Sequence, residues 1–304
     1  MVAPLPLDDV PAPFRVRDGL QNGLTRKHLR SAREWDAPFR GIRAPVGSSA
    51  DLASRCRALA TVLDEGTAFS HTTALRLLGV EVPWTLADDA DIHVVTQRQE
   101  SRVDRPGVVA HRSRQSFLET TTVDGLLVTS PAQTFVHVGT MLRMPDDVVV
   151  LGDAMMRRKH ALTTTAALTD IAERTFKIKG IAQVREQIRS MRPGTDSSTE
   201  TRTRLALVDA NLPCPQVNEI VRDPDGRYVK RVDLLYPQYK IAIEYDGDQH
   251  RTDPAQWRDD IRRRRLLEDL GWIVIVVVVD DLRDPGLLVS RVRTAIRSAR
   301  ADRA

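Results

Sequence analysis

Cysteine is scarce in this sequence. Only Cys56 and Cys214 occur among 304 residues, and they are too few and too far apart for a disulfide framework or a thiolate metal cluster. This usage is compatible with a reducing compartment, so we expect a cytoplasmic protein.

Long apolar runs are also absent. No window approaches the ~20 apolar residues that a membrane-spanning helix needs. The N-terminus, MVAPLPLDDVPAP, lacks the basic start and apolar core of a secretion signal. We therefore expect no membrane partner.

Neither sign of charge dominates. The chain has 45 Lys and Arg against 41 Asp and Glu, a formal net charge of +4 and a pI near 9.3. Such a mild basic excess is compatible with a nucleic-acid partner but is common in proteins without one. With 41% hydrophobic and 28% charged residues, the composition is that of a globular protein and excludes disordered and fibrous classes.

The length exceeds what one hydrophobic core usually serves. A Pro, Gly and small polar cluster, MRPGTDSST, interrupts the helical period near residue 193. We predict a small helical element at 1–48, an α+β recognition region at 49–192, and an α/β domain at 193–304.

The first two regions give a coarse pattern. Residues 14–30 indicate two short helices broken at Gly23, with Thr25 able to cap the second. This stretch resembles a small helix-turn-helix, and a plain amphipathic helix pair is the alternative. Farther on, residues 146–159 and 162–190 indicate one helix each.

Beyond residue 193 helical and strand patterns alternate, which predicts α/β layers. The expected elements are a helix at 199–211, strands at 216–222, 228–235 and 240–246, a helix at 254–270, a strand at 272–279, and a helix at 286–300. We interpret the run IVIVVVV in the last strand as buried on both faces.

Two acids mark the most informative stretch, KRVDLLYPQYKIAIEYDGDQH. If the strands form a hairpin that turns between Gln238 and Tyr239, Asp233 lies directly opposite Glu244. Side chains alternate along a strand, so these acids share a face with Asp246, and the apolar residues between them point to the core. Paired like charges repel.

A hard divalent cation such as Mg²⁺ or Mn²⁺ would remove this repulsion, because it binds carboxylate oxygens and substrate phosphate together. Asp233, Glu244 and Asp246 are the candidate metal ligands. The alternative is a solvated face on which each acid finds an Arg or Lys partner.

The same stretch carries a family resemblance. The string VDLLYPQYKIAIEYDGDQH, followed by RRRRLLEDLGWIVIVV, resembles the PD-(D/E)XK nuclease superfamily and its branch related to very short patch repair endonucleases, over residues 197–300. The resemblance implies a restriction-endonuclease-like α/β/α domain with Asp233 and Glu244 as metal ligands and Glu200 as a supporting acid.

One part of the family pattern is missing. The superfamily's usual lysine, two positions after the second acid, is replaced by Asp246. By the resemblance, His250 is the best substitute, as a general base or as a hydrogen-bond donor to the phosphate; an exposed loop histidine is the alternative. Glu200 has an alternative too, because Ser-x-x-Glu from Ser197 is a capping box.

Basic residues follow the acids. Arg262–Arg265 span just over one helical turn, so they cannot all face one way. Arg258 and Arg262 share a helix face and are our candidates for contact with nucleic-acid phosphates; an ion-paired solvated surface is the alternative.

The middle region shows no cluster with ligand spacing, and we interpret His71, His93, His111 and His137 as histidines without a shared site. FSHTTALRLLGV and LLVTSPAQTF are similar to AbiEi-type antitoxin proteins, over residues 14–160. That looser resemblance implies a winged-helix-like start and a front end that binds DNA or a partner.

These patterns together predict a Mg²⁺- or Mn²⁺-dependent endonuclease, with DNA favoured as the substrate. Asp233, Glu244, Glu200 and His250 are the expected catalytic residues. The alternative is a non-catalytic DNA-binding regulator, or an antitoxin-like protein, that has a degenerate nuclease fold. A homodimer or a genetically linked protein is the expected protein partner.

Overall fold

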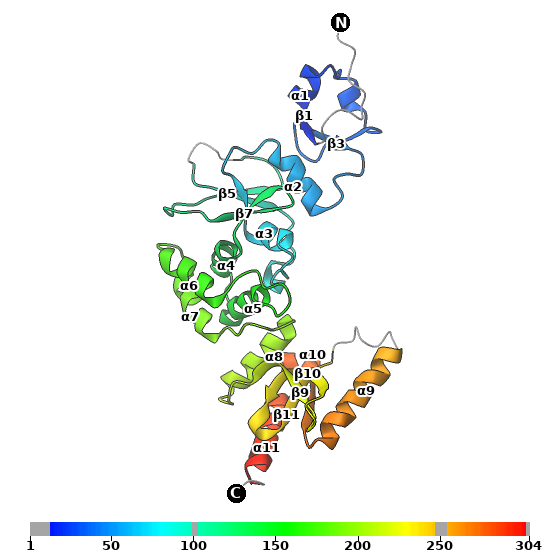
Figure 1. The fold of residues 1–304 in the computed structure, drawn as a ribbon. Coiled ribbons are helices and arrows are strands. Elements are labelled where there is room, and N and C mark those ends of the chain that lie inside the picture. The colour runs from blue at the N-terminus through cyan, green and yellow to red at the C-terminus, as the bar shows by residue number, and fades with distance from the viewer. Residues whose placement is uncertain (1–12, 99–102, 247–253, 302–304) are drawn as a thin grey trace. The chain divides into compact units, whose positions relative to one another are not determined.

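The computed structural model describes residues 13–98, 103–246 and 254–301, with the backbone alone at 254–258. Helices and strands are mixed throughout, which confirms the mixed α/β class (Figure 1). The chain separates into two compact units. The first comprises Met1–Leu142 and Asp170–Ile181, and the second comprises Arg143–Thr169 and Ala182–Ala304.

The second unit therefore includes residues 143–169 and 182–192, which the sequence pattern placed in the middle region. Helix α5 (Pro145–Met155) lies against α8 (Ser198–Asp209). Asp153 of α5 and Arg204 of α8 form a fully buried ion pair, with Arg204 Nη2 2.9 Å from Asp153 Oδ2. Such tertiary pairing leaves no local signal in the sequence. The division into three parts stays a prediction.

The first unit begins with a small three-stranded sheet that the sequence did not predict. Its strands, in the order β1-β3-β2, are β1 (Phe14–Arg15), β3 (Ile42–Pro45) and β2 (Trp35–Asp36), with helix α1 (Val16–Gln21) and the 3₁₀ turn η2 (His28–Arg30) beside them. Phe14 packs edge-on against Trp35, with ring centroids 5.0 Å apart. Thr25 Oγ1 accepts from the N–H of His28 at 3.2 Å, but the cap residue of η2 is Lys27, whose side chain makes no capping hydrogen bond.

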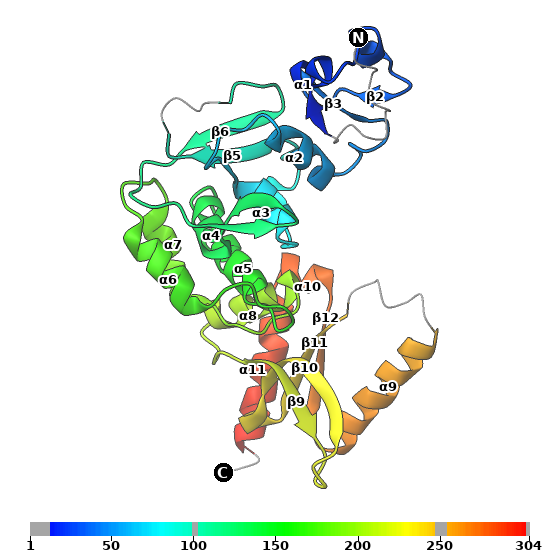
Figure 2. The ribbon, with the colours of Figure 1, turned by 45° about the horizontal axis from the view of Figure 1, so that its top comes forward.

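A five-stranded mixed sheet forms the rest of this unit (Figure 2). In the order β6-β5-β4-β8-β7 its strands are β6 (Val108–Arg112), β5 (Ile92–Thr96), β4 (Ala68–Phe69), β8 (Leu126–Thr129) and β7 (Thr120–Val123). Three helices accompany it: α2 (Leu52–Ala60), α3 (His71–Leu77) and α4 (Pro131–Gly139). A 3₁₀ turn, η3 (Trp84–Leu86), precedes β5. The core of this unit joins α2 and α3 to β4, β5 and β8.

The single helix predicted at 162–190 is wrong. The chain forms α6 (Thr165–Arg174) and α7 (Ile181–Gln187), and the 3₁₀ turn η4 (Ile188–Ser190) follows. Gly180 separates the two helices with a φ of 91°, a conformation that a right-handed helix cannot contain. The sequence pattern hid this break because the flanking segments both have helical periodicity.

The second unit contains a four-stranded sheet in the order β12-β11-β10-β9. Its strands are β9 (Gln216–Arg222), β10 (Tyr228–Tyr236), β11 (Ile241–Tyr245) and β12 (Ile273–Val277). The strands β9, β10 and β11 pair antiparallel, whereas β11 and β12 pair parallel through the crossover helix α9 (Pro254–Asp269). Helices α10 (Val279–Arg283) and α11 (Gly286–Ala301) end the chain. All seven elements expected beyond residue 193 occur, with bounds shifted by two residues at most.

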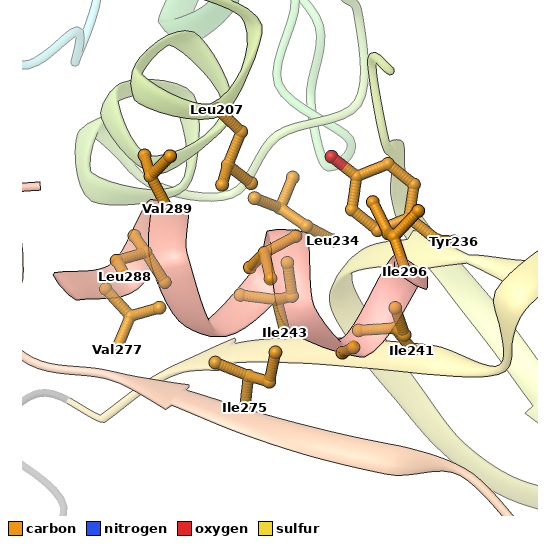
Figure 3. Packing of buried hydrophobic residues seen from close by; sticks show 12 residues of the cluster. Leu207, Leu234, Tyr236, Ile241, Ile243, Ile275, Val277, Leu288, Val289 and Ile296 are labelled. Carbon is orange, nitrogen blue, oxygen red and sulfur yellow. The ribbon is translucent and has the colours of Figure 1, made fainter. Parts of the chain in front are cut away.

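Helices cover both faces of this sheet. On one face, α8 and α11 pack on apolar side chains of β10, β11 and β12 (Figure 3). On the other face, Leu267 of α9 packs with Leu235 and Ala242. The predicted alternation is confirmed, since Leu234, Tyr236, Ile241 and Ile243 all belong to the first cluster.

Strand β12 lies at the edge of the sheet. Ile273 is 41% exposed, and Val278 and Val279, just beyond the strand, are 42% and 45% exposed. The prediction of a strand buried on both faces is therefore wrong. A run of β-branched residues reflects strand propensity as well as burial, and here it does not report a central position.

The longest helices described are α9 and α11, with 16 residues each. No helix in the described ranges combines the length and the apolar composition needed to cross a lipid bilayer.

Candidate functional site

The hairpin of β10 and β11 has the predicted register. The observed partners are Leu234 with Ile243, Leu235 with Ala242, and Tyr236 with Ile241. Continued by one position, this register puts Asp233 opposite Glu244. The turn is the 3₁₀ segment η5 (Pro237–Tyr239), closed by Lys240 in the left-handed conformation.

Asp233 is an acid in an unfavourable place for its charge. Burial, together with the neighbouring carboxylates of Glu200 and Glu244, raises the pKa of Asp233 to about 7, against the lowering effects of the Tyr245 N–H and Lys230. Its Oδ2 accepts from the Tyr245 N–H at 2.9 Å. The carboxyl group is therefore close to half protonated near pH 7.

Glu244 is buried, and its charge is already compensated. Lys230 of β10 places its Nζ 2.8 Å from both carboxylate oxygens of Glu244. The lysine supplies the positive charge that the sequence pattern assigned to a metal ion or to an Arg or Lys neighbour. It also brings an ammonium group to the acids, although the family's lysine is absent from position 246.

Glu200 caps α8 and faces the acids as well. The Ser197 Oγ accepts from the Glu200 N–H at 3.2 Å and donates to Glu200 Oε1 at 2.9 Å. The other oxygen, Oε2, accepts from Asp196 N at 2.9 Å and Asn218 Nδ2 at 2.7 Å. Burial raises the pKa of Glu200. The capping interpretation is confirmed, with the acid reaching one residue farther back than in a standard capping box.

The other predicted site residues are less informative. Asp246 is exposed just beyond β11, and its N–H donates to the Val277 carbonyl at 2.8 Å. Arg262 lies on α9 with its side chain 76% exposed, 3.8 Å from Asp259. His250 and the side chain of Arg258 lie outside the described residues. Their assigned roles stay predictions.

A second group of titratable side chains was missed by the sequence analysis. His71 begins α3, His93 is in β5, His111 is in β6 and His137 is in α4. The ring centroid of His71 lies 3.7 Å from that of His111 and 4.7 Å from that of His137, and both pairs of rings are stacked. Because four elements contribute one histidine each, no fixed spacing signals the cluster. The only available signal was a histidine on each of two strands, which β5 and β6 bring side by side.

One hydrogen bond and one close contact with a carboxylate order these rings. His93 Nδ1 lies 2.8 Å from His111 Nε2, and His93 Nε2 lies 2.9 Å from Asp89 Oδ2. Burial raises the pKa of Asp89, but hydrogen bonds from Thr72 and His93 outweigh it and leave this pKa below its ordinary value. Asp89 is thus a carboxylate at neutral pH.

His71, His111 and His137 are neutral at pH 7. Burial is the main cause that lowers the pKa of His111 and of His137 to about 4. It lowers the pKa of His71 still more clearly below its usual range, and the neighbouring histidines add to the effect. Neutral imidazoles offer a nitrogen lone pair, which is the form that binds metal ions.

A cavity of about 390 Å³ opens beside this cluster, within the first unit. Three of the four histidines line it, together with several cationic side chains: His71, His111, His137, Arg112, Arg114 and Lys177. One ring nitrogen each of His71, His93 and His111 lie within 4.8 Å of one another. Among the described residues, this is the set of three or more side chains that could hold a metal ion.

No family model and no solved structure match this sequence. Two proteins of Mycobacterium tuberculosis are similar: MT2308 of strain CDC 1551 and Rv2248 of strain H37Rv, both named as uncharacterized. Each is 30% identical over 251 residues, which is 82% of this chain and 89% of the relative. The match is longer than either compact unit and so runs through both. The chain therefore belongs to the same family as these two mycobacterial proteins.

Proposed function

We propose that the second unit is a metal-dependent endonuclease that hydrolyses phosphodiester bonds, with DNA as the favoured substrate. The proposal is carried by one observation: Glu200, Asp233, Glu244 and Lys230 converge from α8 and the β10–β11 hairpin. The order α8, β9, β10, β11, α9, β12, with helices on both faces of the sheet, supports a restriction-endonuclease-like fold.

The acids fit a hard divalent cation. Asp233 loses its charge at a higher pH than an ordinary aspartate because of burial and its acidic neighbours, and a bound cation would reverse that cost. Asp233 and Glu244 would hold Mg²⁺ or Mn²⁺, which supplies an activated water and neutralises phosphate charge.

The chain's own residues have separate tasks in this proposal. Lys230, 2.8 Å from Glu244, is placed to attract the substrate phosphate and takes the task of the absent family lysine. Glu200 raises the pKa of Asp233 while it caps α8. His250 keeps its predicted role in proton transfer.

The test is plasmid nicking with Mg²⁺ or Mn²⁺ by the full-length chain. Asp233→Asn and Glu244→Gln preserve side-chain shape, and each should lower the nicking rate by at least ~100-fold. Asp225→Asn is the matched control, because this acid is in the β9–β10 turn with its side chain 67% exposed. Equal cutting by all four proteins would sink the assignment.

A second function has an observation in its favour. Lys230 occupies both oxygens of Glu244, and all the hydrogen bonds described at Glu200 are internal to the unit. Acids whose oxygens are already occupied by partners within the unit suit a scaffold that has lost catalysis and binds DNA as a regulator. Binding of DNA by the wild-type protein with no nicking under either metal would favour this regulator.

A further inference from the structure

We propose that His71, His93 and His111 form a binding site for one borderline divalent metal ion of the Zn²⁺ class, with an open coordination position toward the neighbouring cavity. The site is in the first unit and is independent of the acids of the proposed nuclease site. Its three ligand nitrogens lie within 4.8 Å of one another.

The ligand type selects the metal class. Imidazole nitrogen suits Zn²⁺, Cu²⁺, Ni²⁺ and Fe²⁺, whereas Mg²⁺ prefers carboxylate, carbonyl and water oxygens. Three histidines with a fourth position left for water or substrate are the pattern of an open zinc site. The acids of the second unit and these histidines therefore differ in the metal that they would take.

Asp89 orients one ligand. His93 Nε2 lies 2.9 Å from Asp89 Oδ2, close to the carboxylate but without hydrogen-bond geometry. The nearby negative charge favours the tautomer with the proton of His93 on Nε2 and the lone pair on Nδ1. That lone pair points at His111, since His93 Nδ1 lies 2.8 Å from His111 Nε2. Histidine ligands commonly donate their other nitrogen to a carboxylate in this way.

The present distance between these nitrogens suits a hydrogen bond. Two nitrogens on a tetrahedral Zn²⁺ ion lie about 3.3 Å apart, given the usual Zn–N bond length. His93 and His111 are 2.8 Å apart, so ion entry requires a parting of roughly half an ångström and a tautomer change at His111. The hydrogen bond holds the ligands near their places until an ion replaces it.

The backbone at His71 is unusual. His71 has a φ of 51° at the first position of α3, a left-handed conformation that residues with a Cβ seldom adopt and that concentrates at functional sites. The His71 ring stacks on that of His111, with centroids 3.7 Å apart.

The open side faces a cavity that suits an anion. His137 is nine-tenths buried there, and its Nδ1 has no hydrogen-bond partner within the described residues. Arg112, Arg114 and Lys177 line the same cavity. A water or an anionic ligand on the metal would meet positive charge and a free imidazole nitrogen.

The experiment measures metal content of the metal-stripped full-length protein after equilibration with buffered Zn²⁺, and the visible absorption of the Co²⁺ form. The wild-type protein should take up about one Zn²⁺ per chain at this site. His71→Asn, which tolerates a positive φ, and His111→Gln should each weaken uptake at least ~10-fold.

Two controls keep the outcome decisive. His160→Asn replaces an exposed histidine that has a φ of 57°, so it matches the backbone change of His71→Asn and should retain Zn²⁺. Asp233→Asn should also retain it, which separates this site from the nuclease proposal. Circular dichroism verifies that each variant is folded. Undiminished Zn²⁺ in folded His71→Asn and His111→Gln, or none in the wild-type protein, would overturn the proposal.

Discussion

At the residue scale, two aspartates show how neighbours set the behaviour of a carboxyl group. Asp153 is fully buried but receives Arg204 Nη2 at 2.9 Å, Thr201 Oγ1 at 3.0 Å and the Arg192 N–H at 2.7 Å. Asp233 is surrounded by other acids and accepts one described hydrogen bond. Asp153 is therefore a structural group, whereas Asp233 is poised to gain a proton or a cation.

Asp233 should make stability depend on pH. Its folded pKa of about 7 lies above the ordinary 3.8, so its protonation stabilises the fold below pH 4, and that contribution is lost as pH rises through 7. We compare the free energy of unfolding of Asp233→Asn with that of the wild-type protein in EDTA. From pH 5 to pH 8 this difference should shift in favour of the variant by on the order of 1–3 kcal/mol. Urea unfolding at both pH values measures it, and an unchanged difference would contradict it.

Asp153→Ala should destabilise the protein strongly. The change leaves the guanidinium of Arg204, 1% exposed, without its carboxylate, and an uncompensated buried charge costs roughly 3–5 kcal/mol. Urea unfolding gives the free-energy change, and Asp225→Ala on an exposed turn is the control. A loss no larger than that of the control would show that Arg204 finds another partner.

At the element scale, the sequence analysis predicted correctly those elements whose signal lies within a short stretch of the chain. The β10–β11 register was predictable, because a single turn and alternating side chains fix it locally. The sheet of β1, β2 and β3 was not, since strands of two to four residues are too short to show alternation. The break between α6 and α7 was missed because the segments on both sides of it have helical periodicity.

Gly180→Ala tests how closely the chain packs between these two helices. A Cβ at Gly180 would lie 2.8 Å from the Thr140 carbonyl oxygen, in addition to the strain of a φ of 91°. Gly125→Ala is the matched control, with a φ of 80° and nothing within 4 Å. Thermal unfolding should show about 1 kcal/mol lost at Gly125 and clearly more at Gly180. Equal losses would mean that the backbone of Thr140 moves aside without cost.

At the scale of the whole molecule, the two candidate sites differ in how visible they were. Asp233 and Glu244 lie on one hairpin, so spacing along the chain revealed them. The four histidines come from α3, α4, β5 and β6, and only the tertiary fold joins them. Lys230 was missed for a related reason: the family pattern directed attention to position 246, whereas the ammonium group comes from the neighbouring strand.

The proposed binding of DNA leads to a prediction about its dependence on salt. The logarithm of the binding constant should fall linearly with that of the salt concentration, and Arg262→Ala should reduce the slope by about 1. Arg283→Ala is the control, since both side chains are 76% exposed and both lie near an aspartate. Fluorescence anisotropy measures the slopes, and identical slopes for all three proteins would remove Arg262 from the interface.

The hairpin also bears on how the molecule acquires its sites. A hairpin needs closure of a short loop, so its contacts form early and at small entropic cost. Asp233 and Glu244 should thus meet before α9 has carried the chain across to β12. The four histidines come from α3, α4, β5 and β6, so they should meet only after these elements have packed together. During refolding, signals that report on the pairing of Asp233 with Glu244 should therefore appear before signals that report on the stacking of the histidine rings.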